Sequence, residues 1–396
     1  METTFAAQPT TLEGVWQWWR WMREHDPVSW DEKYGAWHVF RYADIVRVLA
    51  DPLTFSSDLV GLLPPQPEIE LFSKGNFVRM DPPRHDKLRK LVSKAFTPRV
   101  VADLEPRITE VTDELLDAVT GEPGFDLVAA LAYPLPVTVI AELLGVPASD
   151  RGLFRTWADA LLNQPLPDRM LPDEETLRLR AAPLHDMIGY LLTHIRDRRA
   201  APRDDLTSQL IDAEVDGERL VDDEIVGFVG LLLIAGHITT TTLLTNTVLC
   251  LDTHPDAARD LRADLSLVPT ALEEVLRDRA PFPRLARVAT AASAVGERTV
   301  PAGQVINLWI GSANHDEREF LDPDDFDIRR SPNPHLSFGH GIHFCLGAPL
   351  ARLEAAIAVP MLLRRCPDLA VADGVELFDA RVMAGARRLP VAALWA

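Results

Sequence analysis

The stretch from Asp222 to Pro255 constrains the fold of this chain most, because about 30 consecutive residues follow a helical pattern with few charges. It reads DDEIVGFVGLLLIAGHITTTTLLTNTVLCLDTHP. A helix that is apolar on all sides has to be buried in the middle of a protein. The sequence therefore predicts a mainly helical core built around this segment.

The run AGHITTTT inside that helix has a glycine and a threonine cluster where better helix formers would be expected. Glycine in a helix interior costs about 0.5–1 kcal/mol relative to alanine, so a compensating function is expected at Gly236. The alternative is that Thr239 to Thr242 only hydrogen-bond to carbonyls four residues earlier.

A second segment, HLSFGHGIHFCLG, is followed directly by the helical pattern APLARLEAAIAVPMLLRR. Glycines at this density allow sharp turns and a close approach of the backbone to a flat ligand. The cysteine stands just before a helix N-terminus, where unpaired N–H groups and the helix dipole favour the thiolate, which is the metal-ligating form. A small buried cysteine after an ordinary turn is the alternative. The specified positions follow the order FGxGxHxCxG: Phe338, Gly339, Gly341, His343, Cys345 and Gly347.

Composition excludes several classes of protein. With 396 residues, of which 47% are hydrophobic, the chain can bury a large core. Cys250, Cys345 and Cys366 lie far apart and form no CxxC pair, so neither a disulfide framework nor a zinc site is predicted and a cytoplasmic location fits. No signal peptide or uninterrupted apolar run of membrane-spanning length is found, so no membrane anchor is expected. The net charge of −19 argues against nucleic acid as a partner.

Three further patterns place charged residues at helical spacings. DPPRHDKLR puts His85 and Arg89 on one face of a helix, and EEVLR puts Glu274 and Arg277 three residues apart. FDIRR supplies Arg330, with Arg329 as a possible substitute. Residues of this kind are usually on the surface, and an exposed ion pair contributes little to stability.

Taken together, these segments resemble the cytochrome P450 superfamily, specifically its soluble bacterial haem-thiolate monooxygenases. The resemblance runs from about residue 27 to the end, with DPPxHxxxR, AGxxT, ExxR, FDxxR and FGxGxHxCxG in the expected order. It implies one domain over residues 1–396 with a mainly α fold and small β-sheets. A β-rich part is expected near the N-terminus, and haem b between the long central helix and the cysteine loop.

The resemblance also implies roles for individual residues. Cys345 would be the metal ligand. The cofactor-binding residues would be His85, Arg89, Arg287, Phe338, Gly339, His343 and Gly347. The catalytic set in the long helix would be Ala235, Gly236 and Thr239. A structural triad would comprise Glu274, Arg277 and Arg330. The substrate pocket would include Leu231, Ile234, Ile238, Phe282, Leu285 and Met383.

One position departs from the family pattern. The family usually has Asp or Glu immediately before the catalytic threonine, where it relays protons, whereas this chain has Ile238. An isoleucine side chain cannot exchange protons. His237, Thr240, ordered water or a hydroxyl of the substrate would have to take over the relay, or oxygen activation would be less well coupled.

The implied activity is insertion of one oxygen atom from O2 into a C–H or C=C bond of a hydrophobic natural product. The sequence looks most like members that tailor macrolides and related polyketides. Electrons would come from NAD(P)H through a ferredoxin reductase and a ferredoxin. The ferredoxin would dock on the basic patch from Arg84 to Arg99, although a run of charges can also be only a solvated face.

Two alternatives remain open at the level of sequence. A peroxide-driven oxygenase would be marked by an arginine near the iron in the long helix, and that segment contains none. A haem-binding or ligand-binding protein without catalysis is the other alternative. The irregular segments 59–80 and 163–183 are predicted to be loops that shape the pocket.

Overall fold

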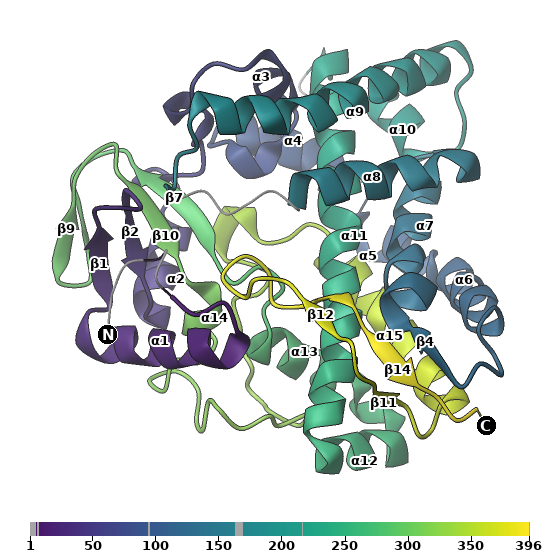
Figure 1. The fold of residues 1–396 in the computed structure, drawn as a ribbon. Helices are drawn as coiled ribbons and strands as arrows, with labels where there is room; N and C mark the ends of the chain where they lie inside the picture. The colour runs from purple at the N-terminus through teal and green to yellow at the C-terminus, as the bar shows by residue number, and fades with distance from the viewer. Residues whose placement is uncertain (1–4, 6–7, 94–95, 163–168, 216, 396) are drawn as a thin grey trace.

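The computed structural model describes residues 5, 8–93, 96–162, 169–215 and 217–395 (Figure 1). Its α-helices, in chain order, are α1 (Leu12–His25), α2 (Tyr42–Ala50), α3 (Pro67–Ser73), α4 (Arg84–Ser93), α5 (Pro98–Ala102), α6 (Glu105–Asp117), α7 (Pro134–Leu143), α8 (Arg151–Leu162), α9 (Glu174–Ala200), α10 (Leu206–Asp212), α11 (Asp222–Thr253), α12 (Pro255–Ala263), α13 (Val268–Asp278), α14 (Ile310–Ala313) and α15 (Ala348–Arg365). Shorter helical turns are η2 (Val60–Leu62), η3 (Phe77–Arg79), η5 (Val128–Ala132), η6 (Ala148–Asp150), η7 (Leu265–Leu267) and η8 (Gly341–His343). The predicted mainly α fold is confirmed.

The strands are short. They are β1 (Val28–Asp31), β2 (Ala36–Val39), β3 (Phe55–Ser56), β4 (Gly124–Asp126), β5 (Glu214–Val215), β6 (Glu218–Arg219), β7 (Leu285–Ala289), β8 (Ser293–Val295), β9 (Arg298–Val300), β10 (Val305–Leu308), β11 (Ala370–Val371), β12 (Glu376–Leu377), β13 (Ala386–Arg388) and β14 (Pro390–Ala392). The C-terminal strand β14 pairs with β11 and β4.

The largest sheet combines distant parts of the sequence. Its strand order is β1-β2-β10-β7-β3, so β10 and β7 lie between strands from the first 56 residues. Strand β10 runs parallel to β2 and antiparallel to β7. The β-rich part was predicted to lie near the N-terminus. Two of its strands come from residues 285–308, so it is only partly N-terminal.

Helix α11 runs through the centre of the helical part (Figure 1). It packs against α3, α7, α9 and α15. By length and composition it could cross a membrane, but 72% of its most apolar window is buried inside this fold. Its buried environment explains why apolar residues occur on all of its sides.

The two segments predicted as loops contain regular structure. Pro67 at the first helical position, with Glu68 and Glu70 in the first turn, starts α3, and this helix-start signal was missed. The prediction of an irregular loop is therefore wrong for this part of residues 59–80. In the second segment, residues 163–168 lie outside the described residues, and the part from Glu174 onward belongs to α9.

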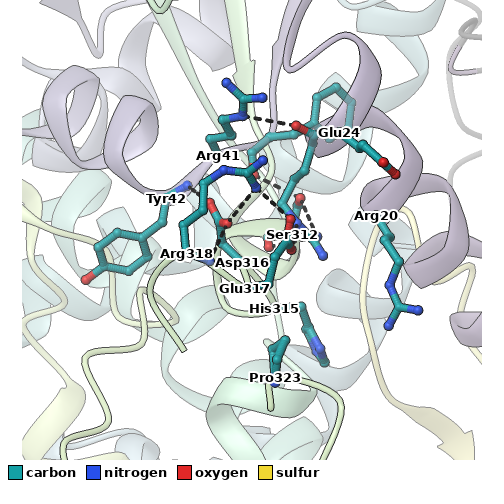
Figure 2. Close-up of polar contacts among 12 residues, drawn as sticks. Arg20, Glu24, Arg41, Tyr42, Ser312, His315, Asp316, Glu317, Arg318 and Pro323 are labelled. Atoms are coloured by element: carbon teal, nitrogen blue, oxygen red, sulfur yellow. Dashed lines mark hydrogen bonds and ion pairs between the residues drawn. The ribbon is translucent and has the colours of Figure 1, made fainter. Parts of the chain in front are cut away.

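A polar network ties α1 to α14 and the turn that follows it (Figure 2). Arg23 is 2% exposed and donates Nη1 to the Ser312 carbonyl at 3.2 Å and Nε to Glu317 at 3.0 Å. The backbone N–H of Tyr42 donates to Asp316 Oδ2 at 2.8 Å. The backbone directly after Ser312 supplies carbonyl groups that accept hydrogen bonds from side chains in the core. The network therefore fixes a segment that supports the candidate active site.

Candidate active site

The cysteine loop folds back on itself before α15 begins. Gly339 and Gly341 have φ of +75° and +70°, a backbone conformation that other residues rarely adopt. A Cβ atom at Gly341 would also press on the carbonyl oxygen of Leu49. The Cys345 N–H donates to the Phe338 carbonyl at 2.8 Å, which closes the loop. The loop thus presents Cys345 two residues before the N-cap residue of α15, Gly347.

The electrostatic surroundings of Cys345 only partly match the prediction. As predicted, the backbone N–H groups of Gly347 and Ala348 favour the thiolate, and Arg89 and Arg352 also lower the pKa of the thiol. Burial opposes them and outweighs them, so the pKa is raised overall. The predicted contribution of the helix N-terminus is thus present, but burial opposes it. A bound metal cation would supply the missing stabilisation.

Cys345 nevertheless has accessible surface. Of the three cysteines it is the exposed one, whereas Cys250 and Cys366 are buried. Burial nevertheless has the largest influence on its pKa, so protein closely surrounds this exposed residue.

Cationic and imidazole side chains gather beside this loop. The rings of His85 and His343 lie 4.4 Å apart, and the Arg89 guanidinium lies 5.5 Å from the ring of Phe77. Arg89 donates Nη2 to the Phe344 carbonyl at 2.6 Å. Four buried nitrogen atoms have no hydrogen-bond partner among the described residues: His85 Nε2, Arg89 Nη1, His343 Nδ1 and His343 Nε2.

Arg287 joins this cluster from β7. It is 6% exposed, and burial lowers its pKa to about 10. Burial, Arg287, His85 and Arg89 together lower the pKa of His343 to about 3, so this imidazole is neutral at pH 7. His85, Arg89 and Arg287, all predicted to bind the cofactor, therefore lie close enough to His343 to act on it.

This set of side chains fits a haem. Its two carboxylates would accept hydrogen bonds from the orphaned N–H groups of the cluster, and its iron would take the Cys345 sulfur. Unpaired buried donors are costly, so their convergence on one space is best explained by an anionic ligand. Phe338 packs beside the loop, with its ring under the Arg352 guanidinium at 4.4 Å, and is half-buried.

The middle of α11 opens toward the same interior. Ala235 is exposed although the helix around it is mostly buried, and Thr239 is half-buried one turn later. Thr239 Oγ1 donates to the Ala235 carbonyl at 3.0 Å, which is the local back-bond expected of a helical threonine. Gly236 has Ile140 of α7 at its back, where an added Cβ would be crowded. The small residues thus leave room on one face of the helix and allow close packing on the other.

The residue before Thr239 takes no part in a polar path. Ile238 is 7% exposed and packs with Met383, Ile234 and Phe378. Both Ile238 and Met383 were predicted to line the substrate pocket, but they are almost fully buried against each other. Phe378 was missed by the sequence analysis because no motif surrounds it.

His237 faces a different neighbour. Its Nδ1 bonds to the Leu233 carbonyl, and its ring meets the edge of Tyr133 at 5.5 Å. Burial lowers the pKa of His237 to about 4, so it is neutral at pH 7. Because Tyr133 directly precedes α7, this histidine lies on the α7 side of α11, which argues against the His237 alternative for the proton relay.

The remaining predicted pocket residues differ in exposure. Phe282 is 38% exposed, in keeping with a pocket-lining position. Leu285, on β7, is half-buried and packs against the core of the β-rich part. Leu231 is half-buried and packs against the helical core. Of the predicted pocket residues, Phe282 is thus the exposed one.

The predicted triad is assembled in the core. Arg277 Nη2 and Nε donate to the two Glu274 oxygens at 2.8 and 2.9 Å, and both side chains are fully buried. Arg330 Nε lies 3.1 Å from Glu274 Oε2. Arg329, the possible substitute, instead pairs with Asp260 on the surface. The ambiguity between the two arginines is therefore resolved in favour of Arg330.

The triad is also bonded to the backbone around it. Arg277 Nη1 donates to the carbonyls of Asn314 and Pro323 at 2.9 and 2.8 Å. The Asn314 side chain in turn accepts from the Leu336 N–H at 2.8 Å, at the start of the cysteine loop. The buried carboxylate is thus linked to the loop that carries Cys345.

Comparison with known proteins gives a consistent result. The family model described as Cytochrome P450 matches residues 63–375. The chain is 47% identical to the cyclomarin C epoxidase CymV of Salinispora arenicola, over 95% of each chain. It is 47% identical to the erythromycin C-12 hydroxylase of Saccharopolyspora erythraea, over 94% of this chain and 92% of that protein. The solved structure of a mutant of P450 EryK in complex with erythromycin B matches with a TM-score of 0.90 and 44% identity over 98% of both chains.

Proposed function

This chain belongs to the cytochrome P450 family and is a monooxygenase, and from that premise we propose that its substrate is a macrolide or a related polyketide. The observation that carries the proposal is the similarity, over nearly the whole chain, to the erythromycin C-12 hydroxylase and to the structure that holds erythromycin B. Relatedness over the entire chain includes the segments that shape the pocket.

Cys345 would hold the iron of the haem, and the bound haem would supply the chemistry that activates O2 for insertion of one oxygen atom into a C–H or C=C bond, with two electrons from NAD(P)H delivered through redox partners. The protein's contribution is to hold the group and to control protons and water. His85, Arg89, Arg287 and His343 would hold its carboxylates. The Glu274 network would keep the cysteine loop in place, and Ala235 would leave room for O2.

An optical titration of the purified ferric protein tests the substrate proposal. We expect a macrolide such as erythromycin B to displace the water ligand and change the spin state of the haem, and we expect terpenoids, fatty acids and small aromatic compounds to do so less readily. A response to small or linear compounds alone would contradict the polyketide proposal while leaving the monooxygenase class intact.

The proton relay is expected to depend on the substrate. Thr239 Oγ1 donates to the Ala235 carbonyl, so its lone pairs remain free to accept from water. Neither Ile238 nor His237 is placed to deliver protons to it. We propose that ordered water and a hydroxyl group of the substrate complete the relay.

Removing that hydroxyl from the substrate should therefore uncouple the reaction. An analogue that lacks the hydroxyl nearest the oxidised carbon should give several-fold less product per NAD(P)H, with the difference appearing as hydrogen peroxide. Product, NAD(P)H and peroxide are measured together, and Thr239→Ala with the normal substrate serves as the reference for an uncoupled enzyme. Unchanged coupling with the analogue would show that the relay is complete within the protein.

The docking of a ferredoxin on the basic patch also belongs to the proposal. The patch carries less free charge than its sequence predicts, because Arg84 pairs with Glu224 at 3.3 Å and Lys87 pairs with Glu218. Arg89 points into the interior, and Lys94 lies outside the described residues. We therefore propose that the exposed Arg99, on α5, contributes to docking.

Reversing the charge at Arg99 tests this docking surface. Arg99→Glu should slow reduction of the haem by a reduced bacterial ferredoxin several-fold at low salt, and the difference should shrink as salt screens the charges. Arg298→Glu, on β9 and exposed in an ion pair with Asp26, is the matched control and should have no effect. Equal rates for wild type and Arg99→Glu would exclude this surface.

A further inference from the structure

We propose that Arg79 binds a carboxylate group of the substrate inside the active site. The inference rests on the proposed function, because it names a chemical group of the substrate that the same site takes. It adds to the polyketide proposal that a member carrying a carboxylate, such as an open-chain polyketide acid, is bound more tightly than its ester.

The backbone on both sides of Arg79 is fixed. Two residues earlier, Phe77 is 4% exposed, and its ring lies 6.0 Å from that of Phe228 on α11. Two residues later, Asp81 accepts a hydrogen bond from the Ser57 N–H at 2.9 Å and another from the Ser56 hydroxyl. Arg79 is thus held between α11 and the end of β3.

This placement brings Arg79 close to the haem-binding cluster. Ser56 of β3 pairs with Val288 of β7, the residue after Arg287. On the other side, the Phe77 ring lies near Arg89 at 5.5 Å and near His85 at 6.1 Å. The segment that carries Arg79 therefore spans the distance between two predicted haem-carboxylate ligands.

Arg79 has accessible surface on this segment, and protein also surrounds it closely, because burial is the largest influence on its pKa and lowers it. This is the combination already described for Cys345. The charge of Arg79 also lowers the pKa of Arg287, so the two guanidinium groups share one environment.

Nothing among the described residues neutralises Arg79 through a direct bond: its side chain makes no hydrogen bond or ion pair there. Asp58 raises its pKa from a distance, but the Asp58 carboxylate accepts from the Val60 N–H at 2.9 Å. A cation surrounded by protein and left unpaired is costly, so an anionic partner is expected.

The number of charges favours a partner on the substrate over one on the haem. A haem has two carboxylates, and Arg89, Arg287 and the two histidines already provide donors for both. Arg79 is a third guanidinium in the same interior. A carboxylate brought by the substrate would pair with it by charge-assisted hydrogen bonds.

A matched series of iron-binding probes tests the inference with the holoenzyme. The probes are imidazoles joined through alkyl chains of three lengths to a terminal carboxylate, and the corresponding methyl esters. For at least one chain length we expect the wild type to bind the acid roughly tenfold more tightly than the ester, as a hydrogen bond to a charged group would give. Arg79→Gln should abolish that preference and leave ester binding unchanged.

Two further variants control for charge and for location. Arg79→Lys should retain part of the preference, since it keeps the cation. Arg84→Gln, which removes an exposed guanidinium paired with Glu224, should bind like the wild type. Equal acid-to-ester ratios in wild type and Arg79→Gln at every chain length would overturn the proposal.

A second measurement separates the two possible sources of the carboxylate. If Arg79→Gln keeps the acid preference but loses haem faster or shifts the reduction potential, Arg79 serves the haem, and the substrate proposal is wrong. The imidazole itself reports an intact haem site in every variant. Failure of this inference is thus distinguishable from failure of the proposed function.

Discussion

Replacing Cys345 with serine is expected to abolish monooxygenation while the fold is retained. The loop is shaped by its glycines and by the bond from the Cys345 N–H to the Phe338 carbonyl, none of which involves the sulfur. An alcohol does not provide the thiolate whose electron donation favours O–O cleavage. Product formation should fall to background, and the reduced carbon monoxide complex should lose the red-shifted absorption of a thiolate-ligated haem.

Circular dichroism and thermal unfolding show whether the fold of Cys345→Ser is intact. Cys366→Ala is the matched control, because Cys366 is buried at the end of α15, away from the loop. It should keep the thiolate spectrum and turnover even if stability falls. A thiolate-type spectrum in Cys345→Ser would show that another residue ligates the iron.

Replacing Arg277 with alanine is expected to destabilise the protein by about 3–5 kcal/mol, because it leaves a buried carboxylate without its main partner. Glu274 would keep Arg330, the Asp327 N–H and the Asn333 amide as partners, but it would lose two short charge-assisted bonds. Three backbone carbonyls, of Asn314, Pro323 and Asp325, would lose a donor as well. Urea unfolding and haem content measure the effect.

Two variants, Arg329→Ala and Arg277→Lys, serve as controls. Arg329→Ala removes an exposed ion pair with Asp260 and should cost at most about 1 kcal/mol. Arg277→Lys keeps the charge but lacks the planar fork, so it should restore only part of the stability and haem content. Similar unfolding free energies for Arg277→Ala and Arg329→Ala would contradict the structural role.

The sequence predicted what depends on local spacing. The loop around Cys345 is encoded by glycines within ten residues of it, and the pair Glu274 and Arg277 follows from a spacing of three residues on one helix. Arg329 and Arg330 could not be told apart, because both match the pattern. Only the fold directs Arg330 inward and Arg329 to Asp260.

The features that the sequence did not predict depend on contacts between distant segments. The basic patch is partly neutralised by Glu218 and Glu224, more than 130 residues further along the chain. Burial of Ile238 against Met383 joins α11 to the segment before β13. Arg79 lies in no motif, and its importance follows only from what surrounds it.

The strand order of the large sheet has a consequence for how the chain acquires its structure. Strands β1, β2 and β3 leave the ribosome early, but β2 and β3 reach their neighbours β10 and β7 only after residues 285–308 are made. Pairing over such sequence separations is slow, because the intervening chain has to be ordered first. For more than half of synthesis, β2 is therefore paired only with β1, and β3 lacks its partner. Arg287 enters the cluster with β7 and Cys345 follows later, so haem capture is one of the last steps of folding.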